Sequence, residues 1–319
     1  MPATMKALAC NSFGPVASLA VMDLPIPEPG PGQIRVRVQA TSINPADAKT
    51  VTGATTMLHA KVFPLVTGWD YSGEVDALGA GTSGFSKGQA VFSFLPYGGS
   101  TRQGALAQFT LVQAAQLAPR PEGVGPDLAA AAATTGITAL QALRLAGVRQ
   151  GSRVLVTGAS GGVGSIAVGI ARRLGAEVEA LTSAAHAGAV AALGASKVWD
   201  RGNSEWIHEP GEPFDAILDA AAAYSYGSLR RLLKRGGSYV TTLPKLSFLT
   251  DFIPARLRGH RTAMVMVRPV RADLEQLAGW LAEGLAVPIA QRYALAQGAE
   301  AMDRAEKGAF FGKLVVTLD

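Results

Sequence analysis

The sequence predicts an α/β protein that combines a β-rich N-terminal domain with a doubly wound parallel sheet. Short strand-like runs separated by Gly and Pro turns fill residues 1 to about 120. After the sequence PRP at 119–121, an Ala-rich helix is followed by alternating strands and helices. A glycine-rich turn, TGASGGVG at 157–164, comes between an apolar run and a helical pattern. A chain of this length can bury more than one core, so we expect two domains.

Each predicted element follows from apolar patterning bounded by turn residues. The N-terminal strands are expected at 5–10, 34–40, 71–78, 90–94 and 106–112. The strands of the parallel sheet are expected at 154–157, 177–181, 197–199, 214–218 and 238–243. Beyond Arg261 we expect a further strand at 263–267, helices at 273–283 and 296–307, and a closing strand at 313–318 that rejoins the first domain.

The glycine-rich turn has the spacing of a dinucleotide-binding fingerprint, with Ala159 in place of the first glycine. A side chain at Gly161 or Gly162 would hold the backbone away from a pyrophosphate, whereas bare N–H groups and the positive end of the following helix attract it. The alternative is an ordinary turn, which Gly clusters also form. The flanking strand and helix, and the second strand at 177–181, favour nucleotide binding by these residues: Gly158, Ala159, Ser160, Gly161, Gly162, Val163 and Gly164.

Composition and charge favour a soluble enzyme. The 319 residues are 48% hydrophobic and 17% charged, with a modest net charge of +5. Cys10 is the one cysteine, so no intramolecular disulfide can form, and the N-terminus lacks the apolar core of a signal peptide. The basic residues are not interleaved with aromatics, which argues against nucleic acid as a partner. The sequence therefore predicts a cytoplasmic protein with no membrane span.

Five further segments carry a recognisable order of motifs. They are SINPAD at 42–47, GWDYSGEV at 68–75, GALAQF at 104–109, TTGITAL at 134–140 and GKLV at 312–315. With these and the glycine turn, the chain resembles the medium-chain dehydrogenase/reductase superfamily, specifically its zinc-free, quinone-oxidoreductase-like (zeta-crystallin-like) branch, over nearly its whole length. The resemblance implies a GroES-like catalytic domain over 1–121 completed by 269–319, a Rossmann NADP-binding domain over 122–268, a cofactor in the cleft, and a homodimer.

A metal site is not expected. Where zinc-dependent relatives carry a ligand Cys and a Gly-His-Glu motif, this chain has Asn44 and the sequence GWD at 68–70. A catalytic zinc needs about three protein ligands, whereas the histidines are scattered at His59, His186, His208 and His260. Without a Lewis acid, reduction of a simple ketone loses its main electrostatic support. A quinone or an α,β-unsaturated carbonyl needs less help, because charge that arrives with a hydride delocalises onto a distant oxygen.

The end of the second sheet strand predicts NADPH as the cofactor. An Asp or Glu there would bind the ribose 2′-hydroxyl of NAD, but Thr182 and Ser183 leave room for a 2′-phosphate, and Glu177 and Glu179 are expected to face solvent. The resemblance implies that His186 and Arg201 contact that phosphate, although Arg201 in a loop could equally be solvated. It also implies that these residues bind cofactor: Thr138, Thr242, Leu243, Phe311, Gly312 and Lys313.

Asn44 and Asp47 match residues that relatives place beside the nicotinamide. There an amide can donate to a substrate carbonyl and a carboxylate can fix its neighbours, although Asn-Pro-x-Asp is also a good turn sequence. Some relatives carry a Tyr soon after this motif, whereas this chain has Lys49. Lys49 or water is therefore a candidate proton donor. Tyr71 and Tyr97 are the other candidates, against the alternative that both pack in the core.

We therefore expect an NADPH-dependent, metal-independent reductase of a quinone or an α,β-unsaturated carbonyl. The basic cluster RLRGHR at 256–261 is either a solvated loop or a clamp for the phosphates of coenzyme A or a carrier arm, which would make the protein a trans-acting enoyl reductase. A third reading is a non-catalytic NADPH-binding sensor, structural or RNA-associated protein. Apolar loop residues expected to line the substrate pocket are Met57, Leu58, Phe94, Leu95, Phe248 and Phe252.

Overall fold

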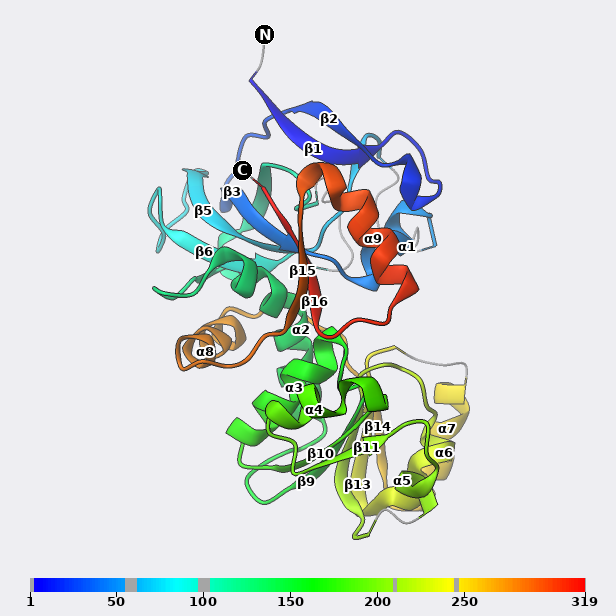
Figure 1. The fold of residues 1–319 in the computed structure, drawn as a ribbon. Coiled ribbons are helices and arrows are strands. Elements are labelled where there is room, and N and C mark those ends of the chain that lie inside the picture. The colour runs from blue at the N-terminus through cyan, green and yellow to red at the C-terminus, as the bar shows by residue number, and fades with distance from the viewer. Residues whose placement is uncertain (1–2, 55–61, 97–103, 209–210, 244–246, 319) are drawn as a thin grey trace.

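The computed structural model of the protein describes residues 3–54, 62–96, 104–208, 211–243 and 247–318, and the side chains of all of these except 247–250. The chain forms two lobes, with the N- and C-terminal parts together in the upper lobe of Figure 1 and the middle of the chain in the lower lobe. This arrangement agrees with the predicted GroES-like and Rossmann domains.

The upper lobe contains two sheets built from both ends of the chain. A three-stranded antiparallel sheet has the order β2-β1-β4, with β1 at Thr4–Cys10, β2 at Ala20–Pro25 and β4 at Leu65–Val66. In the second sheet, β16 runs antiparallel to β3, so the last strand of the chain completes the N-terminal domain as predicted. This sheet has the order β15-β16-β3-β5-β6-β8, with β7 also paired to β3, and its strands are β3 (Gln33–Ser42), β5 (Asp70–Leu78), β6 (Ala90–Phe94), β7 (Phe109–Gln113), β8 (Ala118–Pro119), β15 (Ile289–Ala294) and β16 (Lys313–Thr317).

The lower lobe is a six-stranded parallel sheet with the order β11-β10-β9-β12-β13-β14. The strand order reverses beside β9, which is where a doubly wound sheet binds its ligand. The strands are β9 (Arg153–Thr157), β10 (Glu177–Thr182), β11 (Lys197–Asp200), β12 (Phe214–Asp219), β13 (Leu233–Thr241) and β14 (Arg261–Met264). The helices of this lobe are α3 (Gly162–Arg173), α4 (Ala187–Ala192), α5 (Glu205–His208), α6 (Tyr226–Leu229) and α7 (Ser247–Leu257).

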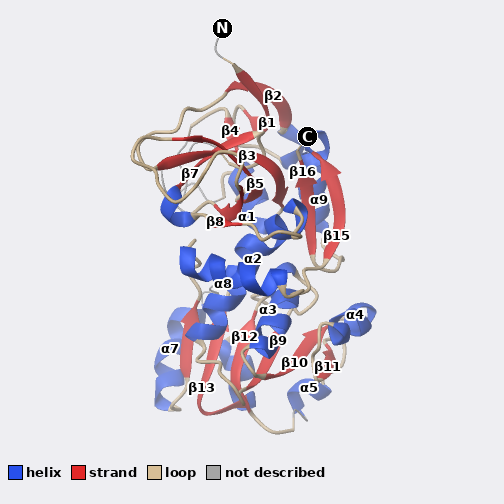
Figure 2. Ribbon diagram, turned by 90° about the vertical axis from the view of Figure 1, so that its left-hand side faces the viewer, coloured by secondary structure: helices blue, strands red, loops and turns tan. Residues whose placement is uncertain are grey.

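Helix α2 (Pro126–Leu145) lies between the lobes (Figure 2). Its small side chains allow close packing on several sides; a Cβ at Gly136, for example, would lie 2.8 Å from Leu277 Cδ2 of α8 (Arg271–Ala282). This helix is long and apolar enough to cross a membrane, but 78% of its most apolar window is buried inside the protein, as in a core helix. The other helices are α1 (Pro45–Val51) and α9 (Gly298–Lys307), with 3-10 turns at Val16–Ser18, Ala114–Gln116, Ala184–His186, Arg230–Leu232 and Leu295–Gln297.

The predicted elements match the observed ones to within a few residues, and one predicted exposure is wrong. Glu177 is exposed as expected, but Glu179 is buried, because it accepts hydrogen bonds from the Arg153 guanidinium and from Trp199 Nε1, the latter at 2.6 Å. The strand pattern alone gave no sign of these two partners on β9 and β11. Cys10 is a buried packing residue, and its burial raises the pKa of the thiol.

Candidate active site

The glycine turn forms a tight cradle after β9. Gly158 has φ +66°, and a Cβ there would lie 2.6 Å from Ala221 Cβ. A Cβ at Gly164 would lie 2.2 Å from Gly158 O, so both positions require glycine. Gly161 caps α3 without a side-chain hydrogen bond. The first N–H groups of this helix therefore point, with the positive end of its dipole, at the space where a phosphate would bind.

The loop before β16 closes on this cradle from the other lobe. Gly312 N donates to Ser160 O at 2.9 Å, and Gly161 and Gly312 form a parallel bridge. A Cβ on Gly162 would lie 2.6 Å from Lys313 Cδ, which means that the Lys313 side chain packs directly on the start of α3. Val163 is half-buried in the same turn.

Asn44 and Asp47 lie at the start of α1, where Pro45 begins the helix. Asn44 N donates to Asp47 Oδ2 at 2.7 Å, while Asp47 Oδ1 accepts from Gly68 N at 3.0 Å and from the Thr67 hydroxyl at 3.2 Å. Burial raises the pKa of Asp47 to about 7, and the nearby Asp70 carboxylate adds to the shift. Asp47 therefore holds the start of α1 against the Gly68 turn, which agrees with the orienting role expected of it.

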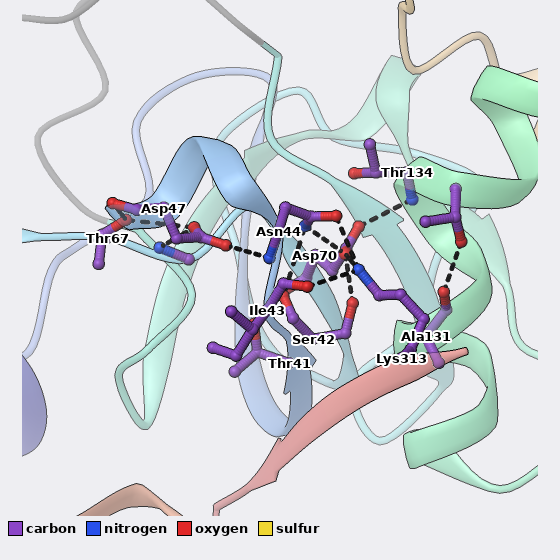
Figure 3. Close-up of polar contacts among 12 residues, drawn as sticks. Thr41, Ser42, Ile43, Asn44, Asp47, Thr67, Asp70, Ala131, Thr134 and Lys313 are labelled. Carbon is purple, nitrogen blue, oxygen red and sulfur yellow. Dashed lines mark hydrogen bonds and ion pairs between the residues drawn. The ribbon is translucent and has the colours of Figure 1, made fainter. Parts of the chain in front are cut away.

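The Asn44 side chain belongs to a buried polar group that we call the Asp70 cluster: Ser42, Asn44, Asp70, Thr134 and Lys313 (Figure 3). Asn44 Nδ2 donates to Asp70 Oδ2 at 2.7 Å, and Thr134 N of α2 donates to Asp70 Oδ1 at the same distance. The Ser42 hydroxyl also donates to Asp70 Oδ2. Asp70 is fully buried, so these donors replace the water that a carboxylate requires.

Lys313 is the cation of the Asp70 cluster. Its Nζ donates to Ile43 O and to Asn44 Oδ1, both at 2.7 Å, and lies 3.7 Å from Asp70 Oδ2. Burial lowers the pKa of Lys313, and Asp70 and Asp47 oppose that shift. The sequence predicted that Lys313 binds cofactor. In the structure its ammonium group instead points into the Asp70 cluster, and only its stem reaches the glycine turn.

Two of the predicted proton donors lie outside this cluster. Tyr71 follows Asp70 on β5, and because successive side chains of a strand point to opposite faces, it packs in the core with Val36, Val75 and Trp69. Burial raises the pKa of the Tyr71 hydroxyl, so its prediction as a donor is wrong. Lys49 is on the exposed side of α1, and Tyr97 lies outside the described residues.

The end of β10 brings together the residues predicted to bind a 2′-phosphate. Thr182 Oγ1 is buried and has no hydrogen-bond partner among the described residues. The Ser183 hydroxyl lies 3.2 Å from His186 Nδ1, and Arg201 N donates to Thr182 O at 2.7 Å. Sequence reasoning overlooked Asp200, whose Oδ1 accepts from Ala184 N at 3.1 Å and from Gly202 N at 3.0 Å.

The other predicted cofactor residues lie near the carboxyl ends of the parallel strands or on α2. The Phe311 and His186 rings are stacked with their centroids 6.0 Å apart, so the loop before β16 also meets the β10 end. Thr242 follows β13, where its hydroxyl donates to Ala220 O at 3.2 Å, and the neighbouring Leu243 is exposed. Thr138 is buried one helical turn beyond Thr134. The prediction for these residues stays untested.

No group of three His, Cys, Asp or Glu side chains within the described residues could hold a metal ion. His186 lies by β10, His208 ends α5 and His260 Nδ1 lies 3.0 Å from the Tyr226 hydroxyl, while His59 is outside the described ranges. Within the described ranges, the donors therefore do not form a zinc site.

The basic cluster at 256–261 lies at the wrong end of the sheet for a cofactor clamp. In the register of the parallel sheet, Arg261 pairs with Ser238, Ser238 with Ala216, and Ala216 with Val154. Val154 is at the amino end of β9, so Arg261 lies at that end of the sheet as well. The glycine turn follows the carboxyl end of that strand. Among the predicted pocket residues, Phe94 and Leu95 are buried and Phe252 is exposed on α7. Met57, Leu58 and the Phe248 side chain lie outside the described parts of the chain.

Asp70 and Thr134 are functional candidates that sequence reasoning missed. The signal was present in the GWD motif, because a carboxylate directly follows the position where zinc-dependent relatives carry a ligand histidine. Its partners come from β3, α2 and β16, and no spacing rule connects segments that distant. The hydroxyl of Thr134 is buried and without a hydrogen-bond partner in the described structure, and thus remains free to meet a bound molecule.

Comparisons with known proteins agree with this fold. Residues 30–122 match the family described as alcohol dehydrogenase GroES-like domain, and residues 193–316 match the family described as zinc-binding dehydrogenase. The chain is 30% identical to a chloroplast envelope quinone oxidoreductase homologue of Arabidopsis thaliana over 98% of both chains. It is 27% identical to a chloroplastic quinone-oxidoreductase homologue of Spinacia oleracea over 87% of both. The solved quinone oxidoreductase of Coxiella burnetii has a TM-score of 0.88 and 26% identity, and the match covers 99% of this chain and 100% of that one.

Proposed function

Because this chain belongs to the zinc-free, quinone-oxidoreductase-like branch of the medium-chain dehydrogenase/reductase superfamily, we propose that it transfers a hydride from NADPH to a quinone or an α,β-unsaturated carbonyl without a metal. The observation that carries the proposal is the buried Asn44 amide, which is fixed between Asp70 and Lys313, the residue whose stem packs on the glycine turn.

The residues of the turn fit a dinucleotide. Gly161 and Gly162 leave the start of α3 bare, and the helix has no side-chain cap that would compete for its N–H groups. A pyrophosphate at this point would accept those N–H groups, and the nicotinamide end would extend toward the cleft between the lobes. NADPH supplies the hydride when bound, and the chain supplies position and polar contacts.

Asn44 supports the developing negative charge on the acceptor. One Nδ2 hydrogen is committed to Asp70 at 2.7 Å, but the other makes only a long 3.4 Å contact to Ser42 O. This second hydrogen can donate to a substrate oxygen as charge arrives there. In a conjugated acceptor the hydride adds to carbon, the charge collects on oxygen, and a proton from water completes the reduction. Asn44 then acts mainly in the transition state.

NADPH is the proposed cofactor because the β10 end offers hydroxyls and cations to a 2′-phosphate. The unpartnered Thr182 hydroxyl, the Ser183 hydroxyl and His186 lie together, and the exposed Arg201 follows β11. The Asp200 carboxylate, which would favour NAD, already accepts two backbone N–H groups. Arg201 would then supply the charge that binds the additional phosphate.

We also propose a homodimer that forms at β14. This strand pairs with β13 on one side and ends the six-stranded order, so its outer edge has no strand beside it among the described residues. Exposed apolar side chains lie nearby on α7 and after β13 and β14: Leu243, Phe252, Ile253 and Met266. A second copy that adds its own β14 would cover both the edge and these side chains. Light scattering with size-exclusion chromatography tests this.

The proposed activity is tested by following NADPH oxidation with 1,4-benzoquinone, an enone and a simple ketone, before and after exhaustive chelation. We expect turnover of the two conjugated acceptors, little turnover of the ketone, and no loss on chelation. NADPH binding without turnover of any acceptor would favour a non-catalytic nucleotide-binding protein. Stoichiometric zinc that is lost together with activity would contradict the metal-free mechanism. A marked preference for an acyl-coenzyme A would favour the trans-acting enoyl reductase instead.

A further inference from the structure

One side chain, Lys313, contacts both the glycine turn and the Asn44 amide, which we propose binds the substrate oxygen. We infer that Lys313 is a positioning residue, which fixes the orientation of the Asn44 amide. The inference rests on the proposed function and names a residue through which it works.

The stem of Lys313 is held at the glycine turn. A Cβ built on Gly162 would lie 2.6 Å from Lys313 Cδ and 3.1 Å from the Thr135 methyl of α2. The hydrogen bond from Gly312 N to Ser160 O fixes the backbone beside it. The stem of Lys313 is thus fixed between the glycine turn and α2.

The ammonium group is buried and its partners lie inside the protein. It donates to Ile43 O and Asn44 Oδ1, both at 2.7 Å, and forms an ion pair with Asp70 at 3.7 Å. These partners direct its charge into the Asp70 cluster rather than toward a cofactor phosphate. This environment differs from that of a phosphate-binding lysine, and it places the charge of Lys313 beside Asn44 and Asp70 in the upper lobe.

The geometry sets the direction of the Asn44 amide. A carboxamide can rotate to exchange its oxygen and nitrogen at small steric cost. Here a cation meets the oxygen and the Asp70 carboxylate meets the nitrogen, so only one orientation is stable. That orientation keeps the second Nδ2 hydrogen available at the cleft. The same two charges polarise the amide, which strengthens the hydrogen bond that it donates.

The direct test is Lys313→Met, which keeps the stem and removes the charge. We expect kcat to fall at least tenfold while the dissociation constant of NADPH, measured by fluorescence titration, changes less than about twofold. Because Lys313 acts through Asn44, Lys313→Met should have almost no further effect on kcat in the Asn44→Ala background. Lys307→Met on the exposed side of α9 is the matched control and should behave as wild type.

The pH profile separates positioning from a merely structural role. The charges that face Lys313 are Asp70 on β5 and Asp47 on α1, and the turn at 158–164 adds no charged side chain. As burial lowers its pKa from the ordinary 10.5, wild-type kcat should fall on an alkaline limb below that value. Lys313→Arg, which stays charged, should move this limb upward, and Lys313→Met should lack it. If Lys313→Met does not fold, the Arg variant alone decides.

The possible failures are distinct. Wild-type protein that reduces no quinone or enone would refute the proposed function. An active wild type with Lys313→Met at the same kcat, or with equal losses in the wild-type and Asn44→Ala backgrounds, would overturn the role of Lys313 alone. An alkaline limb that is unchanged in Lys313→Arg would overturn it as well.

Discussion

Two buried aspartates, one in each lobe, are held by different kinds of partner. Asp219 ends β12 and accepts from four neutral donors: the Thr157 hydroxyl at 2.6 Å, Tyr224 N at 2.9 Å, the Tyr239 hydroxyl at 3.0 Å and Ala223 N at 3.2 Å. Asp70 begins β5 and accepts from Ser42, Asn44 and Thr134, and it faces the buried ammonium of Lys313.

The difference indicates which cluster serves structure and which serves chemistry. All donors to Asp219 come from its own lobe, and they fix the loop that packs against Gly158. The partners of Asp70 come from β3, the start of α1, α2 and β16, and they include a cation that is costly to bury. Buried charge is weak evidence for stability, so we attribute the Asp70 cluster to the positioning of Asn44. The predictions below test this division.

The largest effect is expected for Asn44→Ala. Removal of the amide should lower kcat about 10- to 1000-fold, as for loss of one oxyanion-stabilising donor, while NADPH affinity stays nearly intact. Steady-state kinetics with 1,4-benzoquinone and an enone, beside a separate NADPH titration, measure both. Asn11→Ala on the exposed surface is the matched control. Turnover of both acceptors at the wild-type rate would mean that Asn44 is only a turn former.

Asp219→Asn should act on stability rather than on chemistry. The amide cannot accept from all four donors, so we expect a loss of about 2 kcal/mol in the free energy of unfolding, with kcat of the folded protein nearly unchanged. Urea unfolding followed by circular dichroism gives the first value. Asp215→Asn, on the half-exposed end of the same strand, should cost less than about 1 kcal/mol. A large loss of kcat for Asp219→Asn at unchanged stability would reverse our division of the two clusters.

A third strand-end aspartate, Asp200, extends the comparison to a half-buried site. We expect NADPH to bind at least tenfold more tightly than NADH, about 1.4 kcal/mol, and Arg201→Ala to narrow that difference. Isothermal titration of both cofactors measures it, with Arg231→Ala at the far end of the sheet as control. Asp200→Asn, which removes a nearby negative charge, should widen the preference. Equal affinities of the wild type for both cofactors would refute the argument from Thr182 and Ser183.

Sequence patterns predicted the fold well because local signals specify it. The glycine turn, with its apolar strand and helical pattern, identified the centre of the parallel sheet, and β9, β10 and β12 begin and end within a residue of the predicted bounds. Strand-like runs between Gly and Pro turns likewise located strands of the first domain. The closing strand was expected to rejoin that domain, and its pairing with β3 confirms this.

The site was only partly predictable, since its polar contacts join distant segments. Asn44 and Asp47 were found through their motif, but Asp70 became a candidate only when its donors from other elements were known. Lys313 was assigned to the cofactor from the family resemblance, yet a side chain of this length places its charge far from its backbone. Tyr71 was misjudged because it follows Asp70 on β5, and successive side chains of a strand point to opposite faces.

A pH dependence of stability is expected on the side of the molecule that holds Asp70. Burial raises the pKa of Asp47 to about 7 from an ordinary 3.8, so between these values the folded protein binds more protons than the unfolded chain. The unfolding free energy should therefore fall as pH rises from about 4 to 7, by about 1.4 kcal/mol per pH unit at most, and level off above. In Asp47→Asn this contribution should be absent. Urea unfolding of both proteins at several pH values measures the difference, and parallel curves would show that Asp47 titrates normally in the folded state.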